Sequence, residues 1–235
     1  MRIAILEDEP PLAAQMSQLL TGAGHNCHVF PTTRAFQTWL QRETFDLLVM
    51  DWMLPDGTGL EALKKARANL EAVPPTIFVT SRSEEGDIVA ALEAGADDYV
   101  VKPIRPQEML ARVGALLRRN YPAATGAVET FDDYVFDPAG DMLTIAGERV
   151  VLTAKEFALS LLLFQNMHRP LSRAYLLEKV WGRNPDLPTR TLDAHISRVR
   201  TKLGLRPDQG FRLSPVYSFG YRLERIEPAA GAQPE

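Results

Sequence analysis

A short apolar run that ends at a carboxylate is the feature that most restricts how this chain can fold. Residues 47–50, Leu-Leu-Val-Met, are all apolar, and Asp51 follows them directly, before a loop that contains Pro55 and Gly57. Such a run is typical of a strand that is buried on both faces of a parallel sheet. Asp51 would then lie at the carboxyl end of a strand, which is where open α/β sheets bind their ligands. Taken alone, an Asp in this position is also consistent with a turn cap.

The length and the apolar content set broader limits. With 235 residues, the chain can form one large domain or two of ordinary size. Its longest apolar run, residues 158–164, is interrupted by Ser160 and is far shorter than the roughly 20 residues that a membrane-spanning helix needs. Acidic residues at 7–9 interrupt the N-terminus where a signal peptide needs its apolar region. Because the single cysteine, Cys27, cannot form an internal disulfide, we expect a cytoplasmic protein with no membrane contact.

Charge is distributed unevenly along the chain. Residues 1–120 carry 12 Lys and Arg against 16 Asp and Glu, whereas residues 121–225 carry 14 against 12. A basic C-terminal half permits nucleic-acid binding but does not establish it. Helical periodicity gives way to Pro, Ala and Gly within residues 118–127, which indicates a boundary between domains. We therefore expect domains at residues 1–119 and 129–225, a linker at 120–128 and a disordered tail at 226–235.

The first domain alternates strands with helices. Apolar runs predict five strands, at residues 2–6, 28–30, 47–50, 76–79 and 99–101. Helical periodicity and end signals predict five helices, at residues 10–22, 34–43, 59–70, 84–95 and 106–119. In the fourth helix, Ile88, Ala91 and Leu92 form the expected inner face. This alternation predicts an α/β fold, with a parallel five-stranded sheet that helices cover on both faces.

Polar side chains follow four of these five strands. They are, in strand order, Glu7 with Asp8, then Asp51, then Thr80, then Lys102. Three carboxylates held together repel one another unless a cation neutralises them, and oxygen ligands at an open, hydrated edge suit Mg²⁺. A hydroxyl and an ammonium opposite the acids can bind the oxygens of an incoming phosphoryl group. Asp51 is then predicted to be a nucleophile that becomes an acyl phosphate.

With this ordered set of residues, the first domain resembles the receiver domain of two-component response regulators, which has a flavodoxin-like, doubly wound fold. The matching residues are Glu7-Asp8, Asp51, Pro55-Asp56-Gly57, Thr80 and the run from Gly95 to Pro103. The resemblance implies that Asp8, Asp51 and the backbone carbonyl of Met53 bind Mg²⁺ directly. Glu7 would act on the metal through a water molecule.

The same resemblance assigns the residues that bind and sense the phosphoryl group. It implies that Thr80 and Lys102 bind phosphoryl oxygens and that Tyr99 is an aromatic switch. It also implies a cis peptide bond between Lys102 and Pro103. Judged from residue type alone, an aromatic side chain in a buried strand, such as Tyr99, belongs to the core.

The resemblance also implies that the phosphorylated protein forms a homodimer. The face involved would comprise residues 84–95, 99–101 and 106–119. Its charged members are Glu93, Asp97, Asp98, Arg112 and Arg119. The family often has a basic residue on the first of these helices, whereas residues 88–91 here are Ile, Val, Ala and Ala. We therefore expect a more apolar interface.

The second domain has a different, α+β pattern. Strands are predicted at residues 131–136, 141–145 and 149–152, and a hairpin at 211–223. Between them, helices are predicted at residues 153–167, 172–181 and 190–203. Thr153 and Glu156 form a capping box at the start of the first of these helices. Three helices followed by a hairpin indicate a winged helix–turn–helix domain, in which the third helix enters the major groove of DNA.

The third helix has two distinct faces. Its core stripe consists of Leu192, Ile196, Val199 and Leu203. Its outward face consists of Arg190, Ala194, Ser197, Arg198 and Thr201, residue types that read base edges and bind phosphates. An ordinary solvated helix face could have a similar composition. However, Asp193 is the one acid near this face and Glu is absent, which favours DNA as the ligand.

Across its whole length, the second domain resembles the effector domain of the OmpR/PhoB family. The matching runs are residues 152–157, 176–182, 190–200 and 220–222. The resemblance implies promoter DNA as the ligand and RNA polymerase, through a sigma factor or another subunit, as a partner of the loop 183–188. His195 is expected to be structural, since one histidine without partners makes no metal site.

We predict the DNA contacts from position on the helix and from the resemblance. Arg198, near the centre of the outward face, is the expected base reader, and Arg190, Thr191 and Arg200 are expected to contact the DNA backbone. Because Arg200 lies closer to the core stripe, it could instead pair with Asp193. In the wing, Tyr217 replaces an arginine that many family members place in the minor groove, so Arg212 or Arg222 could bind phosphate instead.

These residues favour one function over two alternatives. The favoured function is a phosphorylation-controlled transcription regulator, in which a sensor histidine kinase phosphorylates Asp51 and paired effector domains bind DNA. The alternative from another class is an enzyme, a haloacid-dehalogenase-like phosphatase, which needs a second Asp where this chain has Met53. A third hypothesis is DNA binding that does not depend on phosphorylation, and the complete acidic set argues against it. We therefore predict a regulator that is not an enzyme.

Overall fold

The computed structural model divides the chain into two compact units, Met1–Ala123 and Ala124–Glu235, which are described separately. The description covers residues 1–121, 127–182 and 189–226. Most of the predicted linker at 120–128 and of the predicted tail at 226–235 lies outside these residues, as does the loop 183–188. Among the described residues, no helix has the length and apolar content needed to cross a membrane.

The first unit is built on a parallel sheet of five strands in the order β2-β1-β3-β6-β7. These strands are β1 (Arg2–Leu6), β2 (Asn26–Phe30), β3 (Leu47–Met50), β6 (Thr76–Thr80) and β7 (Asp98–Val101). Five helices surround the sheet: α1 (Pro10–Gly22), α2 (Thr33–Leu40), α3 (Gly59–Asn69), α4 (Glu85–Glu93) and α5 (Pro106–Asn120). The predicted doubly wound α/β fold is confirmed.

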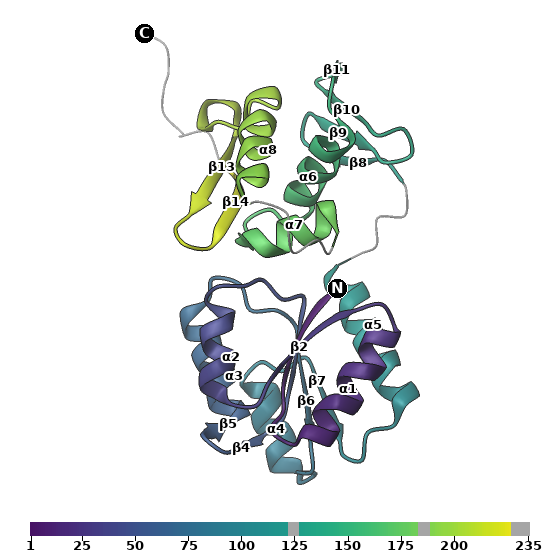
Figure 1. Ribbon diagram of the computed structural model, residues 1–235, viewed down its shortest axis with the longest axis vertical. Coiled ribbons are helices and arrows are strands. Elements are labelled where there is room, and N and C mark those ends of the chain that lie inside the picture. The colour runs from purple at the N-terminus through teal and green to yellow at the C-terminus, as the bar shows by residue number, and fades with distance from the viewer. Residues whose placement is uncertain (122–126, 183–188, 227–235) are drawn as a thin grey trace. The chain divides into compact units, whose positions relative to one another are not determined.

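Alternate residues of each strand face opposite layers of helices, so the sheet has a core on each side. Figure 1 shows α1 and α5 on one side of the sheet and α2 and α3 on the other. In β3, Val49 packs with α1 and α5, whereas Leu48 and Met50 pack with α2 and α3. With both faces covered, the polar residues that follow the strands are held at the edge of a rigid layer.

Two details of this unit differ from the predictions. Leu92 was predicted to face the core, but its side chain is 48% exposed, because α4 buries a narrow stripe in which Ala91 is the fully buried member. The loop after Asp51 also forms a small antiparallel ladder between β4 (Met53–Leu54) and β5 (Gly57–Thr58), which its Pro- and Gly-containing sequence did not indicate.

The second unit combines two antiparallel sheets with three helices. One sheet contains β8 (Glu129–Phe131), β9 (Tyr134–Asp137), β10 (Met142–Ile145) and β11 (Glu148–Val150). The other contains β12 (Leu171–Ser172), β13 (Phe211–Val216) and β14 (Gly220–Arg225), in the order β12-β14-β13. The helices are α6 (Ala154–Gln165), α7 (Arg173–Trp181) and α8 (Thr189–Lys202), and a 3₁₀ turn, η1 (Pro207–Gln209), precedes β13. Helices followed by a hairpin confirm the winged helix–turn–helix arrangement.

The predicted strand at 131–136 is wrong. A turn at Asp132, which has a φ of 53°, separates β8 from β9, and the two strands pair with each other. Asp tolerates this left-handed conformation better than most residues, so two consecutive Asp residues favour a turn over a continuous strand.

Strand β12, which was not predicted, joins the wing to the start of α7. It pairs with β14 through Leu171 and Ser172. Gly220 makes this pairing possible, because a Cβ atom there would lie 2.0 Å from the carbonyl oxygen of Leu171. The hairpin β13–β14 is therefore packed directly against the segment that begins α7.

Candidate functional site

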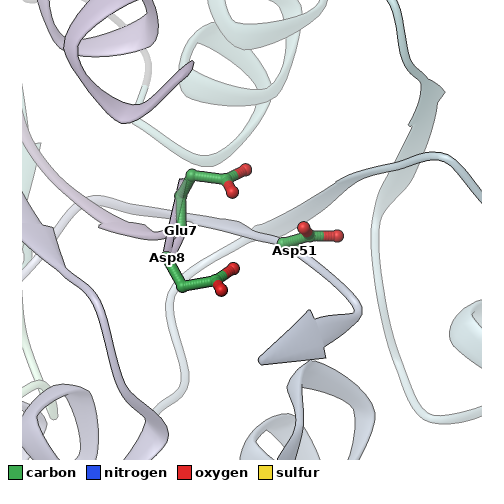
Figure 2. A group of neighbouring side chains, drawn as sticks. All are labelled: Glu7, Asp8 and Asp51. Atoms are coloured by element: carbon green, nitrogen blue, oxygen red, sulfur yellow. The ribbon is translucent and has the colours of Figure 1, made fainter. Parts of the chain in front are cut away.

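Three carboxylates from two strand ends meet at one edge of the parallel sheet. Glu7 and Asp8 follow β1 and Asp51 follows β3, and one oxygen of each lies within 4.8 Å of the others. The sheet fixes these positions, since the backbone N–H of Glu7 donates to Phe30 (3.1 Å) and that of Asp51 donates to Leu6 (2.8 Å). Figure 2 shows the three side chains together at the ends of β1 and β3. The sequence-based prediction of an acidic group at this edge is therefore confirmed.

Lys102 joins two of these carboxylates. Its Nζ donates to Asp51 Oδ2 at 2.7 Å and to Glu7 Oε2 at 2.9 Å. Burial raises the pKa of Glu7, and the hydrogen bond from Lys102 only partly offsets this. Burial would lower the pKa of Lys102, but the hydrogen bonds to Asp51 and Glu7 outweigh it, so the pKa is raised and the ammonium stays charged. The peptide bond between Lys102 and Pro103 is cis, as the resemblance implied.

Thr80 and Tyr99 both lie near the loop that connects β6 to α4. Thr80 is fully buried, and its Oγ accepts a hydrogen bond from the backbone N–H of Arg82 at 3.4 Å. Tyr99 is half-buried and packs against the core cluster that contains Phe78. Its ring stacks on Phe78, with centroids 6.3 Å apart, and its hydroxyl donates to the carbonyl of Arg82 at 2.8 Å. Burial raises the pKa of Tyr99, so the hydroxyl remains a donor at neutral pH.

Arg82 and Trp52 also belong to this region, although no motif in the sequence singles them out. The guanidinium of Arg82 lies 5.3 Å from the ring centroid of Trp52 and forms an ion pair with Asp87 of α4 at 2.7 Å. The backbone N–H of Trp52 donates to Asp51 Oδ1 at 2.5 Å. Arg82 therefore connects α4 to the residue that follows Asp51. Their closeness in sequence to Asp51 and Thr80 is the one signal that could have identified them.

The two faces of α8 are arranged as predicted. The core-stripe side chains are buried: Leu192, Ile196, Val199 and Leu203. The outward residues are exposed: Arg190, Ala194, Ser197, Arg198 and Thr201. Tyr217, at the tip of the hairpin, is 96% exposed. This placement gives a basic and polar surface on α8, with an aromatic ring that projects from the wing of the same unit.

Contacts within the unit occupy several other predicted DNA-binding side chains. The Nε of Arg200 donates to the carbonyl of Leu213 at 3.0 Å, so the alternative pairing of Arg200 with Asp193 is wrong. Arg212 and Arg222 each form an ion pair with Glu224 at 3.1 Å. Thr191 is half-buried, and its carbonyl contacts His195.

His195 has the structural role that was expected for it. Its Nδ1 donates to the carbonyl of Thr191 at 2.8 Å, and its ring packs edge-on against Trp181, with centroids 5.0 Å apart.

The charges predicted for a dimer interface are paired within one chain. Arg112 binds Asp98 at 2.9 Å, and Arg119 binds Asp97 at 3.0 Å. Glu93 is exposed on α4. Three large apolar side chains are also exposed on α4 and β7: Val89, Leu92 and Val101.

Comparison with known proteins identifies both units. Residues 3–114 match the family model described as response regulator receiver domain, and residues 147–223 match the model described as transcriptional regulatory protein, C terminal. The chain is 34% identical over 203 residues to the phosphate regulon transcriptional regulatory protein PhoB of Pseudomonas aeruginosa, and the match covers 86% of this chain and 89% of that protein. It is 35% identical over 226 residues to the sensory transduction protein RegX3 of Mycobacterium tuberculosis, covering 94% and 98%. A solved structure, the response regulator DrrB of Thermotoga maritima, an OmpR/PhoB homolog, is similar at 30% identity and a TM-score of 0.46, covering 95% and 98%.

Proposed function

Because the chain belongs to the OmpR/PhoB family of two-component response regulators, we propose that Asp51 accepts a phosphoryl group from a sensor histidine kinase and that this controls promoter binding through α8 and the wing. The observation that carries the proposal is the position of Asp51, a nearly buried carboxylate beside two other acids and bound to Lys102. The cytoplasm would supply both the kinase domain and the DNA.

The transfer requires a nucleophile and neutralisation of charge. An oxygen of Asp51 forms a bond to phosphorus while the bond from phosphorus to the imidazole nitrogen of the donor breaks, and that nitrogen keeps the electron pair and takes a proton. Lys102 already contacts Asp51 Oδ2, so its ammonium lies within reach of a phosphoryl group attached there. Thr80, at the end of the adjacent strand β6, supplies a buried hydroxyl.

The acidic cluster fits a divalent cation. Three carboxyl groups share a single ammonium, so the cluster has an excess of acidic groups, and all three offer hard oxygen ligands. Asp8, Asp51 and the backbone carbonyl of Met53 are the residues we assign to Mg²⁺, with Glu7 acting through water. When bound, Mg²⁺ would neutralise charge on the phosphoryl oxygens.

The first experiment measures the intact mass of the full chain after incubation with acetyl phosphate or carbamoyl phosphate and Mg²⁺. The wild-type chain should gain the mass of one phosphoryl group, and Asp51→Asn should gain none. Asp56→Asn is the matched control, because Asp56 is an acid five positions further on that caps α2 through Thr33 and lies outside the acidic cluster. An Asp51→Asn variant that labels as well as the wild type would show that another residue is the acceptor.

The residue at position 53 argues against the phosphatase alternative. A general acid is needed two positions after the nucleophile, and the thioether of Met53 has no proton to donate. By name, one of the relatives identified above is a transcriptional regulatory protein and the other is a sensory transduction protein. We therefore favour regulation over catalysis.

We further propose that the phosphorylated protein dimerises through α4, β7 and α5, with Val89, Leu92 and Val101 as the contact. Internal ion pairs already satisfy Arg112 and Arg119. RNA polymerase is the expected partner during transcription, and the loop assigned to it, residues 183–188, lies outside the described residues.

A further inference from the structure

Within α8 itself, which the structure describes from residue 189 to 202, Asp193 is the one carboxylate, and two other elements hold it. Its Oδ1 accepts a hydrogen bond from the hydroxyl of Tyr221 in β14 at 2.6 Å, and the same oxygen accepts a second from the guanidinium of Arg173 in α7. The Cζ atom of Arg173 lies 5.5 Å from the ring centroid of Tyr221. One side chain of α8 is thereby connected both to the wing and to α7.

A backbone hydrogen bond connects two of these elements, the wing and α7, a second time. The N–H of Arg173 donates to the carbonyl of Phe219 at 3.1 Å. A Cβ atom at Gly220 would lie 3.0 Å from the backbone nitrogen of Arg173, so only glycine allows this close contact. Arg173 is therefore fixed to the wing by its main chain, and its side chain extends from there to α8.

From this arrangement, and resting on the DNA-binding function, we propose that Arg173, Asp193 and Tyr221 are positioning residues that set the orientation of α8 relative to the wing and thereby the sequence preference for DNA. Base contacts in a groove need an alignment of about 0.5 Å, whereas phosphate contacts tolerate larger displacements. A loss of the Asp193 contacts should therefore reduce discrimination between sequences more than it reduces general affinity.

Through its charge, Asp193 also affects the affinity for DNA of any sequence. Its side chain is 44% exposed, so the carboxylate would face DNA phosphates if no cation were nearby. Hydrogen bonds from Tyr221 and Arg173 lower the pKa of Asp193, so it stays ionised, and Arg173 supplies the neutralising charge. Removing Asp193 should then strengthen binding to any DNA while it weakens discrimination.

The test uses the full chain and two DNA duplexes. One duplex is enriched from a randomised pool by the wild-type protein, and the other is a scrambled sequence of the same composition. For Tyr221→Phe, which removes only a hydroxyl, the ratio of the two affinities should fall by about tenfold, with little change on the scrambled duplex. For Asp193→Ala, the ratio should also fall while affinity for the scrambled duplex rises. In the variant that combines Tyr221→Phe with Asp193→Ala, the affinity ratio should fall no further than in the more affected single variant. Both substitutions break the same hydrogen bond, so their effects should not add.

The matched control is an ion pair that connects β14 to an element other than α8. Arg225 binds Asp132 at 2.6 Å, so Arg225→Gln should leave the affinity ratio unchanged. Unfolding by urea, followed for each variant, separates stability from discrimination. Equal loss of affinity for both duplexes in Tyr221→Phe would overturn the positioning role and leave a purely structural one. Failure of the wild-type protein to enrich any duplex would overturn the DNA-binding function itself, and the positioning role with it.

Discussion

The acidic site of the first unit and the outward face of α8 differ in where their charged residues come from and in how far these residues are buried. The acidic site collects residues 7, 8, 51 and 102, which follow strand ends that are far apart in the sequence. Glu7 and Asp51 are buried and share the ammonium of Lys102 through hydrogen bonds, and Asp8 lies half-buried beside them. The face of α8 takes its residues from one helix and leaves them exposed. Buried groups that share partners depend strongly on one another, whereas exposed groups on a helix act almost independently. Substitutions should therefore have coupled effects in the first unit and separable effects in the second.

Removal of Lys102 should produce the largest effect. Lys102→Ala leaves the carboxylates of Glu7 and Asp51, with side chains 0% and 8% exposed, without their shared cation. Breaking a buried ion pair by removing one partner costs about 3–5 kcal/mol, so the free energy of unfolding of the first unit should fall by that order. Urea unfolding with and without Mg²⁺ measures this, and Mg²⁺ should stabilise the variant more than it stabilises the wild type.

Lys64→Ala is the control for this prediction. Lys64 is exposed on α3, where a substitution is expected to change stability by less than about 0.5 kcal/mol. If both lysine variants unfold at the same urea concentration, the acidic site is not a coupled cluster and the contrast with α8 disappears.

The arginines of α8 should separate into two kinds of contact. Arg198→Ala should cost roughly 1–3 kcal/mol on the enriched duplex and relax the preference at one base position. Arg190→Ala should weaken binding to all sequences alike and lower the salt slope by about one. Affinity measured on specific and scrambled duplexes at several salt concentrations distinguishes them, with Arg206→Ala, an exposed arginine after α8, as the control. Equal losses on both duplexes for Arg198→Ala would mean that another residue reads the bases.

Glu156 is a buried carboxylate in the second unit. It tests whether burial alone accounts for the difference between the acidic site and the exposed face of α8. Glu156 is 2% exposed and accepts hydrogen bonds from Lys202 Nζ (2.7 Å) and from the N–H of Thr153 (2.9 Å). Burial would raise the pKa of Glu156, but these two donors outweigh it, and the pKa is lowered from 4.5. Stability from Glu156 is therefore present above pH 4.5, the value in the unfolded chain, and is lost as the pH falls through the lower folded value.

Unfolding of the second unit as a function of pH measures this contribution, which should be about 1 kcal/mol, the net value of a typical intramolecular hydrogen bond. Glu156→Gln should flatten the acid limb of the curve. An unchanged acid limb in that variant would show that another group controls the acid response.

The expected dimer should give the smallest effect, because it depends on a small apolar contact. Sedimentation of the phosphorylated chain should show a dimer whose stability changes little between low and high salt, since internal pairs satisfy Arg112 and Arg119. Leu92→Glu should prevent the dimer, whereas Lys64→Glu on α3 should not. A chain that stays monomeric at both salt concentrations would remove the proposal.

The sequence predicted those features that depend on local patterns. Apolar runs located the five parallel strands, and the polar residues after four of them located the acidic edge, because the carboxyl ends of parallel strands meet at one edge. The heptad-like spacing of Leu192, Ile196, Val199 and Leu203 likewise identified the buried side of α8.

Features that depend on contacts between distant segments could not be predicted in this way. The β12–β14 pairing and the contacts of Arg82 each depend on where another segment packs. Asp193 shows the limit most clearly. Its partners lie 20 and 28 residues away, on α7 and β14, and helical spacing suggested Arg200 instead.

The close contact at Gly220 divides the hairpin into a segment that can be redesigned and one that cannot. Any side chain at position 220 would collide with the Leu171 carbonyl and separate β14 from the start of α7. Tyr217, three residues earlier, is almost fully solvated. A combinatorial library should therefore randomise residues 217–219 and keep position 220 constant. Such a library would exchange one recognition surface for another on a fixed scaffold, as loop grafting does in binding proteins.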